Sequence, residues 1–192
     1  MGLRFTWESP SCRLVLCAVL SALAELGHAG LTLEEIQARA GAAGQGLEQS
    51  DLDEVVVVAL QHVRLFPVPE ATGSLRGDLL RLLETWLGNR GPDERVIAAV
   101  LSAAEWNPGL RVAVIEAFDR PLAQAVGALL ARATGDGAAQ PERIQTLNWI
   151  LRGLALNRLR AVDARTLVDL HQLVDHLLDG LAPGGGGSPC RT

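Results

Sequence analysis

The sequence predicts an all-α protein, and three observations lead to this fold class. Leu and Ala recur at spacings of three and four residues over most of the chain, which is the period of amphipathic helices. Strand signals are nearly absent, and aromatic residues make up only 4% of the sequence. The only cluster of β-branched residues, Val55–Val58, lies within a helix-length segment between Asp51 and Pro67, and we interpret it as helix.

Capping residues place the first two helices. A helix is expected over residues 11–26, ended by Gly27. Thr32 and Glu35 have the spacing of a capping box, in which the hydroxyl accepts from a free backbone N–H and the carboxylate reaches back. The second helix therefore starts at Thr32 and is expected to end before Gly41.

The next segment has weaker helix signals. A short helix of low propensity is expected around residues 45–49, because neighbouring glycines disfavour helix. A better helix is expected over residues 51–65, with Pro67 and Pro69 as stops.

The rest of the chain predicts a series of longer helices. Caps and breakers place them from Thr72 or Ser74 to 87, and then over 93–106, 108–133, 141–159 and 163–180. Pro121 is expected to kink or split the third of these helices. The glycine-rich residues 183–192 are expected to form a disordered tail.

Composition and charge exclude several classes of protein. All 17 basic residues are Arg, and the net charge of −5 argues against a protein that coats nucleic acid or anionic membrane through bulk charge. No apolar run reaches the roughly 18 residues that span a bilayer, so no membrane association is expected. Three sparse cysteines suit a reducing cytosol, and we expect a cytoplasmic location.

The order of the elements and three sequence stretches resemble a known family. Three short helices precede a linker and five or six longer helices. The stretch AVLSALAELGHAGLTLEEIQARAG at 18–41 and the stretches GSLRGDLLRLL at 73–83 and LRGLALNRLRAVDARTLVDLHQLVDHLLDGLAP at 151–183 are similar to the TetR/AcrR family of transcriptional regulators. The resemblance implies an N-terminal helix-turn-helix head with its linker helix over 1–65. It also implies a ligand-binding and dimerisation domain over 66–182.

The resemblance implies a homodimer that binds an operator in double-stranded DNA through its heads and responds to a small ligand. Arg39 is expected to contact a phosphate, and Gln45 and Gln49 to read base edges. However, residues 1–65 contain four basic and eight acidic groups, and duplex DNA repels such a balance. A second hypothesis therefore remains open: a TetR-derived dimeric ligand-binding or partner protein that has lost DNA binding.

In the second domain, aromatic residues among Leu and Ala are candidates for a pocket that binds a small apolar ligand. The candidate ligand contacts are Trp86, Trp106, Phe118, Asn148 and Trp149, and ordinary core packing is the alternative for each. Two apolar stripes near the C-terminus are candidates for a four-helix dimer interface, with each subunit's own core as the alternative. They comprise Leu147, Leu151, Leu154, Leu167, Leu170, Val174 and Leu177.

No pattern points to catalysis or to a bound metal. No nucleophile stands in a strand–turn–helix context, and no CxxC pair occurs. His171 and Asp175 are one helical turn apart, but solvated positions explain them better than a metal. We therefore expect no enzymatic activity, no metal and no cofactor.

Overall fold

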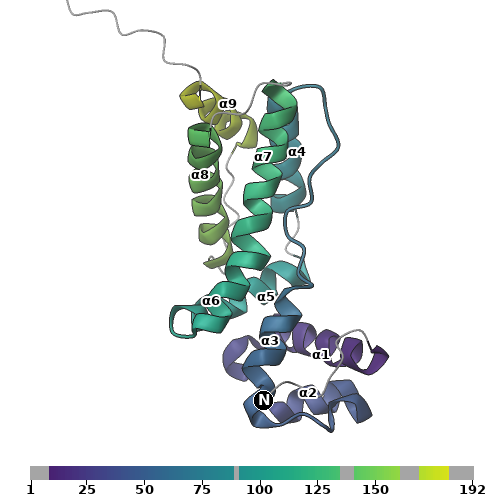
Figure 1. Ribbon diagram of the computed structural model, residues 1–192. Helices are drawn as coiled ribbons and strands as arrows, with labels where there is room; N and C mark the ends of the chain where they lie inside the picture. Colours follow the sequence, from purple (N-terminus) through teal and green to yellow (C-terminus); the bar gives the residue numbers. More distant parts are fainter. Residues whose placement is uncertain (1–8, 89–90, 135–140, 161–168, 182–192) are drawn as a thin grey trace, which may run out of the picture.

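The computed structural model describes residues 9–88, 91–134, 141–160 and 169–181, and all regular structure in these ranges is helical. This confirms the all-α prediction, Val55–Val58 included. A small head at one end of an elongated molecule contains α1 (Pro10–Leu26), α2 (Leu33–Ala40) and α3 (Leu52–Leu60), as Figure 1 shows. A larger helical bundle forms the rest.

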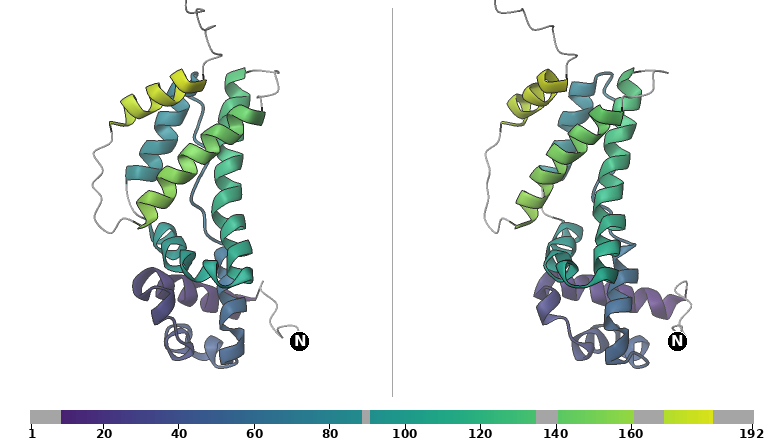
Figure 2. Two further views of the ribbon diagram at one scale, coloured as in Figure 1. Left: turned by 90° about the vertical axis from the view of Figure 1, so that its left-hand side faces the viewer. Right: turned by 60° about the vertical axis from the view of Figure 1, so that its left-hand side comes forward.

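The bundle is built on long helices that lie side by side. It contains α4 (Leu75–Gly88), α5 (Pro92–Leu101), α6 (Pro108–Val114), α7 (Arg120–Thr134), α8 (Pro141–Arg160) and α9 (Leu170–Leu181). Helix α7 packs against both α4 and α8, and α9 packs on α4 at the far end from the head (Figure 2). Helices α5 and α6 contact α1 and α3, so they join the bundle to the head.

The structure confirms the predicted caps of the first two helices, except for one contact of the capping box. Gly27 and Gly41 adopt positive φ angles of 74° and 59°, which favour glycine, and they end α1 and α2. The Thr32 hydroxyl accepts from the backbone N–H of Glu35 at 3.2 Å. The Glu35 carboxylate binds Arg39 rather than reaching back to Thr32, so only half of the capping box carries its expected contact.

Helix α3 is shorter than the predicted 51–65, because apolar residues beyond it are buried in a segment without regular structure. The helix ends at Leu60, and Val63, Leu65 and Phe66 are buried in the segment that leads to α4. The guanidinium of Arg64 turns back and donates to the carbonyls of Gln61 and Val63. Burial of this segment therefore overrides the helical periodicity on which the prediction rested.

The predicted break near Pro121 takes the form of a π-helical turn, η5 (Ile115–Asp119), between α6 and α7. Proline has no N–H, and its ring clashes with the carbonyl four residues earlier in a regular α-helix. The wider turn immediately before Pro121 relieves both constraints without ending the helical rod. The turn also places Phe118 in the core, at 1% exposure, and Asp119 against Arg152 of α8.

A buried carboxylate fixes the start of α4. Asp78 is 3% exposed, and its Oδ1 accepts from the backbone N–H of Thr72 at 2.6 Å and from the Thr72 hydroxyl at 2.7 Å. Arg132 of α7 lies 3.8 Å from the other carboxylate oxygen and donates to the carbonyl of Pro69. These contacts tie the segment before α4 to the body of the bundle.

The last helix starts later than predicted. Asp169 caps α9, since its Oδ1 accepts from the backbone N–H groups of His171 and Gln172. The expected cap at residue 163, the candidate interface residue Leu167 and the expected tail over 183–192 lie outside the described residues.

Candidate functional site

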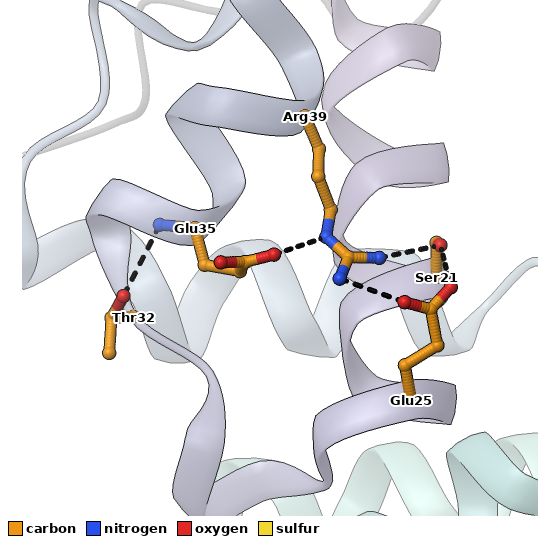
Figure 3. A network of polar contacts seen from close by, with 5 residues as sticks. All are labelled: Ser21, Glu25, Thr32, Glu35 and Arg39. Atoms are coloured by element: carbon orange, nitrogen blue, oxygen red, sulfur yellow. Dashed lines mark hydrogen bonds and ion pairs between the residues drawn. The ribbon is translucent and has the colours of Figure 1, made fainter.

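The head contains an ion-pair network centred on Arg39, the residue expected to contact DNA phosphate. Its Nε donates to Glu35 at 2.7 Å, its Nη2 to Glu25 at 2.9 Å and its Nη1 to the Ser21 hydroxyl at 2.8 Å (Figure 3). Ser21 also donates to Glu25 at 3.0 Å. One guanidinium thus joins the last turn of α2 to α1.

The charges of this network stabilise one another. Hydrogen bonds from Arg39 and then from Ser21 lower the pKa of Glu25 below its ordinary value. Hydrogen bonds to Glu25 and Glu35 raise the pKa of Arg39 in turn. Two carboxylates therefore neutralise the cation, and its donors already have acceptors within the head. This arrangement argues against the predicted phosphate contact, because Arg39 holds the helices of the head together.

The segment after α2 differs from the predicted helix over 45–49. A 3₁₀ turn, η2 (Gly41–Gly44), follows α2, and the next turn, η3 (Gln49–Asp51), leads into α3. Gly44 is buried, and a Cβ atom there would lie 3.0 Å from the Cα of Gln37, so this close approach requires glycine. Gln45 and Gln49 are exposed, but no α-helix presents them together.

The surface of the head is acidic around these two glutamines. Exposed Glu48 precedes Gln49, and Asp51, Asp53 and Glu54 follow it at the start of α3. The described part of the head contains three arginines, at 13, 39 and 64, against seven carboxylates between residues 25 and 54. A duplex that approached this end would meet uncompensated negative charge.

In the bundle, three aromatic rings form one buried cluster. The Phe66 centroid lies 5.6 Å from that of Trp86 and 5.5 Å from that of Phe118, with tilted and edge-on ring planes. Trp86 is 6% exposed, and its indole Nε1 is buried without a hydrogen-bond partner among the described residues. The structure therefore places two predicted ligand contacts, Trp86 and Phe118, within one cluster.

A buried ion pair lies beside this cluster, and the sequence analysis did not single it out. Arg158 of α8 lies 5.6 Å from the Trp86 ring centroid, over its face, and its Nη2 lies 3.4 Å from Oε2 of Glu94. Glu94 is 4% exposed and stands in the first turn of α5, where the helix dipole favours a negative charge. One signal was present, because Arg158 follows Leu151 and Leu154 at helical spacing on the inner stripe of α8.

The other predicted ligand contacts are not part of this cluster. Trp106 is 86% exposed and Trp149 is 74% exposed, so neither side chain is buried among helices as the prediction required. Trp106 lies in the turn before α6, and Trp149 faces outward from α8. Asn148 is half-buried, and its amide oxygen is buried with no hydrogen-bond partner in the described chain.

The comparisons with known proteins identify the bundle. Residues 69–181 match the family model described as "Tetracyclin repressor-like, C-terminal domain", which covers well over half of the chain. The chain belongs to the TetR family. Neither the curated proteins nor the solved structures gave a match. The matched range begins just before α4 and ends with α9, so the TetR-like domain contains Trp86 and Phe118 of the aromatic cluster and the Glu94–Arg158 pair, whereas Phe66 lies just before it.

The predicted TetR-type dimer stripes lie largely within the protomer's own core. The structure buries Leu147, Leu151, Val174 and Leu177, at exposures of 0%, 2%, 0% and 7%. Leu154 and Leu170 are half-buried and pack against that core. Helices of the same chain cover much of the apolar faces of α8 and α9, which is the alternative that the sequence left open for these stripes.

The outer face of α8 carries other apolar groups. Trp149 is 74% exposed and the adjacent Ile150 is 43% exposed. Gly153 is exposed one turn after Trp149, and half-buried Leu156 follows it. By contrast, the exposed side chains of α9 are polar. Asp175 accepts from Arg76 of α4 at 2.7 Å, His171 lies 3.4 Å from the same guanidinium, and His176 is exposed.

The described residues offer neither a metal site nor a membrane-spanning helix. They contain no group of three or more His, Cys, Asp or Glu side chains arranged to hold a metal ion. None of the described helices is long and apolar enough to cross a bilayer.

Proposed function

We propose that this TetR-family protein is a dimeric, ligand-responsive regulator whose head does not bind duplex DNA tightly. The observation that carries the proposal is the neutralised Arg39, followed by a 3₁₀ turn where the family has its reading helix. The head then makes its regulatory contact with a protein partner. An acidic head repels the phosphates of DNA, but it does not repel proteins in general.

The electrostatics support this choice by magnitude. A protein that makes six to ten phosphate contacts loses about 10³–10⁵ in affinity between 50 and 200 mM salt, so charge dominates such binding. This head offers few cations. Arg39 is held by Glu25 and Glu35, and Arg64 donates to two backbone carbonyls. Four carboxylates lie between residues 48 and 54.

Ligand sensing is supported by the TetR-like domain and by its polar groups in an apolar core. Small-molecule sites combine apolar walls with a few placed polar groups, and the Phe66–Trp86–Phe118 cluster beside Glu94 has this composition. Contacts between bundle and head give a route for the response. Asp93 of α5 accepts from the backbone N–H of Arg64, and Asn107 binds Asp53 of α3.

Dimerisation is proposed through the outer face of α8. TetR-family proteins generally dimerise, and exposed Trp149 and Ile150 give this helix an apolar outer surface. An isologous contact around a two-fold axis would bury both copies of each side chain together. Trp106 provides a comparison, because it is also largely exposed but lies in the turn before α6.

Sedimentation velocity tests the dimer. The Trp149→Ser/Ile150→Ser variant is expected to sediment as a monomer at concentrations where the wild type is a dimer, because it loses the central apolar contact. The Trp106→Ser variant should remain a dimer. A wild-type monomer at all concentrations, or dissociation of the Trp106→Ser variant alone, would contradict the proposed interface.

Fluorescence anisotropy tests the head. The labelled duplex is the DNA beside the protein's own gene, measured at 50 and 200 mM salt against a scrambled duplex. We expect no binding tighter than about 10 µM at either salt concentration, which is the range of non-specific affinity. Tight, sequence-selective binding with a steep salt slope would overturn the proposal.

Tight, sequence-selective binding to DNA would favour a second candidate function, that of an operator-binding regulator. One observation favours it: Gln45 and Gln49 are both exposed, and an amide can pair with adenine in bidentate fashion. In that case the Gln45→Ala and Gln49→Ala variants should each lose selectivity for the operator over the scrambled duplex. Each bidentate base contact is worth about 1–3 kcal/mol of discrimination.

A further inference from the structure

We propose that the indole N–H of Trp86 is the ligand-recognising donor of the sensing domain. The ligand class that it fits is an uncharged, planar, mostly apolar molecule with one hydrogen-bond-accepting oxygen. This inference rests on the proposed ligand-responsive function and specifies the site and the chemistry of that response.

The first argument is the state of the donor. Trp86 is 6% exposed, and its Nε1 finds no acceptor among the described residues. Buried polar groups are hydrogen-bonded in the great majority of cases, and a buried donor without an acceptor is costly. An acceptor oxygen on a ligand would satisfy the group. Because indole nitrogen donates only, the complementary ligand atom must be an acceptor.

The second argument is the surroundings of the donor. The Phe66 ring packs against two aromatic rings. Its centroid lies 5.5 Å from that of Phe118 and 5.6 Å from that of Trp86. Phe118 belongs to the π-helical turn, and such turns occur frequently at functional sites. Aromatic faces and edges favour a planar apolar ligand, which can stack on them.

The third argument concerns charge. The Arg158 guanidinium lies over the Trp86 ring and forms an ion pair with buried Glu94, so a cation and an anion already lie together beside the cluster. An added ligand charge would have to leave water and compete with this pair, and the desolvation of an unpaired ion is expensive. A neutral ligand with a single acceptor avoids that penalty.

A pair of isosteric probes tests the assignment. The carbonyl probe is 2-acetylnaphthalene, and the control is 2-isopropenylnaphthalene, which replaces C=O by C=CH₂ and keeps the size and the ring system. Affinities are measured by equilibrium dialysis for the wild-type protein, Trp86→Phe and Trp149→Phe. The last variant makes the same substitution at an exposed tryptophan.

The carbonyl probe should bind the wild type and Trp149→Phe about five- to tenfold more tightly than the hydrocarbon, as one net hydrogen bond predicts. Trp86→Phe should abolish that preference while it still binds the hydrocarbon. Indole ¹H–¹⁵N spectra of the wild type give a measurement that needs no variant at Trp86. The signal most protected from hydrogen exchange should shift with the carbonyl probe and not with its isostere.

Three results would overturn the inference. Equal affinities for both probes, or a preference that survives in Trp86→Phe, would leave a ligand-responsive domain but remove Trp86 as its donor. Binding of neither probe would refute the proposed ligand class at this site. The dimer and anisotropy measurements are independent of all three results, so the proposed function can stand or fall separately.

Discussion

The Asn107 side chain links the bundle to the head, and a double variant that exchanges its amide with the carboxylate of Asp53 tests that link. Its Oδ1 caps α6 by accepting from the backbone N–H groups of Gly109 and Leu110, at 2.9 and 3.1 Å. Its Nδ2 donates to Oδ2 of Asp53 in α3 at 2.8 Å. The side chain therefore has a capping function and a bridging function, and they use different atoms.

The Asn107→Asp variant keeps the cap and inverts the bridge. Aspartate is as good an N-cap as asparagine, but a second carboxylate would face Asp53. Loss of a hydrogen bond to a charged group and like-charge repulsion near 3–4 Å in water together predict about 1–2 kcal/mol of destabilisation. Asp53→Asn, which can keep a neutral hydrogen bond, should cost about 0.5 kcal/mol.

The double variant, Asn107→Asp with Asp53→Asn, restores one donor and one carboxylate with their positions exchanged. We expect its free energy of unfolding to return to within about 0.5 kcal/mol of the wild type, a coupling energy of about 1–2 kcal/mol. Urea unfolding of the four proteins at pH 7 and low salt measures this cycle. Additive effects would refute the bridge, whereas an Asn107→Asp variant as stable as the wild type would show that only the cap at residue 107 matters.

Two further predictions concern the bundle. Leu147→Ala should lower the free energy of unfolding by about 2–5 kcal/mol in urea titrations, because the side chain is fully buried in the protomer's core; a loss below about 1 kcal/mol would contradict that placement. Hydrogen bonds from Thr72, and then the charge of Arg132, lower the pKa of Asp78. The ionised Asp78 carboxylate therefore stabilises the fold fully above the ordinary carboxyl pKa of about 4, and this stabilisation is lost as pH falls through the lowered pKa. Asp78→Asn should therefore be less stable than the wild type at pH 7, and thermal unfolding should show that difference shrinking below about pH 4; a difference constant down to pH 2.5 would refute the role of the charge.

Local chemistry made much of the fold predictable. Gly27 and Gly41 end helices because each adopts a backbone conformation that side chains disfavour, and Pro121 interrupts a helix because it lacks an N–H. These effects depend on the residue and its immediate neighbours, so the sequence alone reveals them. The end of α3 was missed, because Val63 and Leu65 are buried by helices that are distant in sequence.

The candidate sites were less predictable, because their roles depend on which helix faces which. Arg39 was expected to contact phosphate, but its partner Glu25 lies 14 residues earlier on another helix. The periodicity of α8 gave an apolar stripe that includes Leu147, yet a stripe does not specify whether the same chain or a second chain covers it. Likewise, Trp149 resembled a pocket residue only because tryptophan is apolar.

The π-helical turn over Ile115–Asp119 makes the rotational phase between α6 and α7 depend on a single residue. Each residue of an α-helix turns the chain by about 100°, so deletion of one residue within this π-helical turn would rotate α6 by roughly that angle relative to α7. Asn107 would then no longer face Asp53, and the head would lose its register with the bundle. A one-residue deletion here is therefore the mutation that most directly re-aims the head, whereas point substitutions on the surface of α7 would leave its orientation intact.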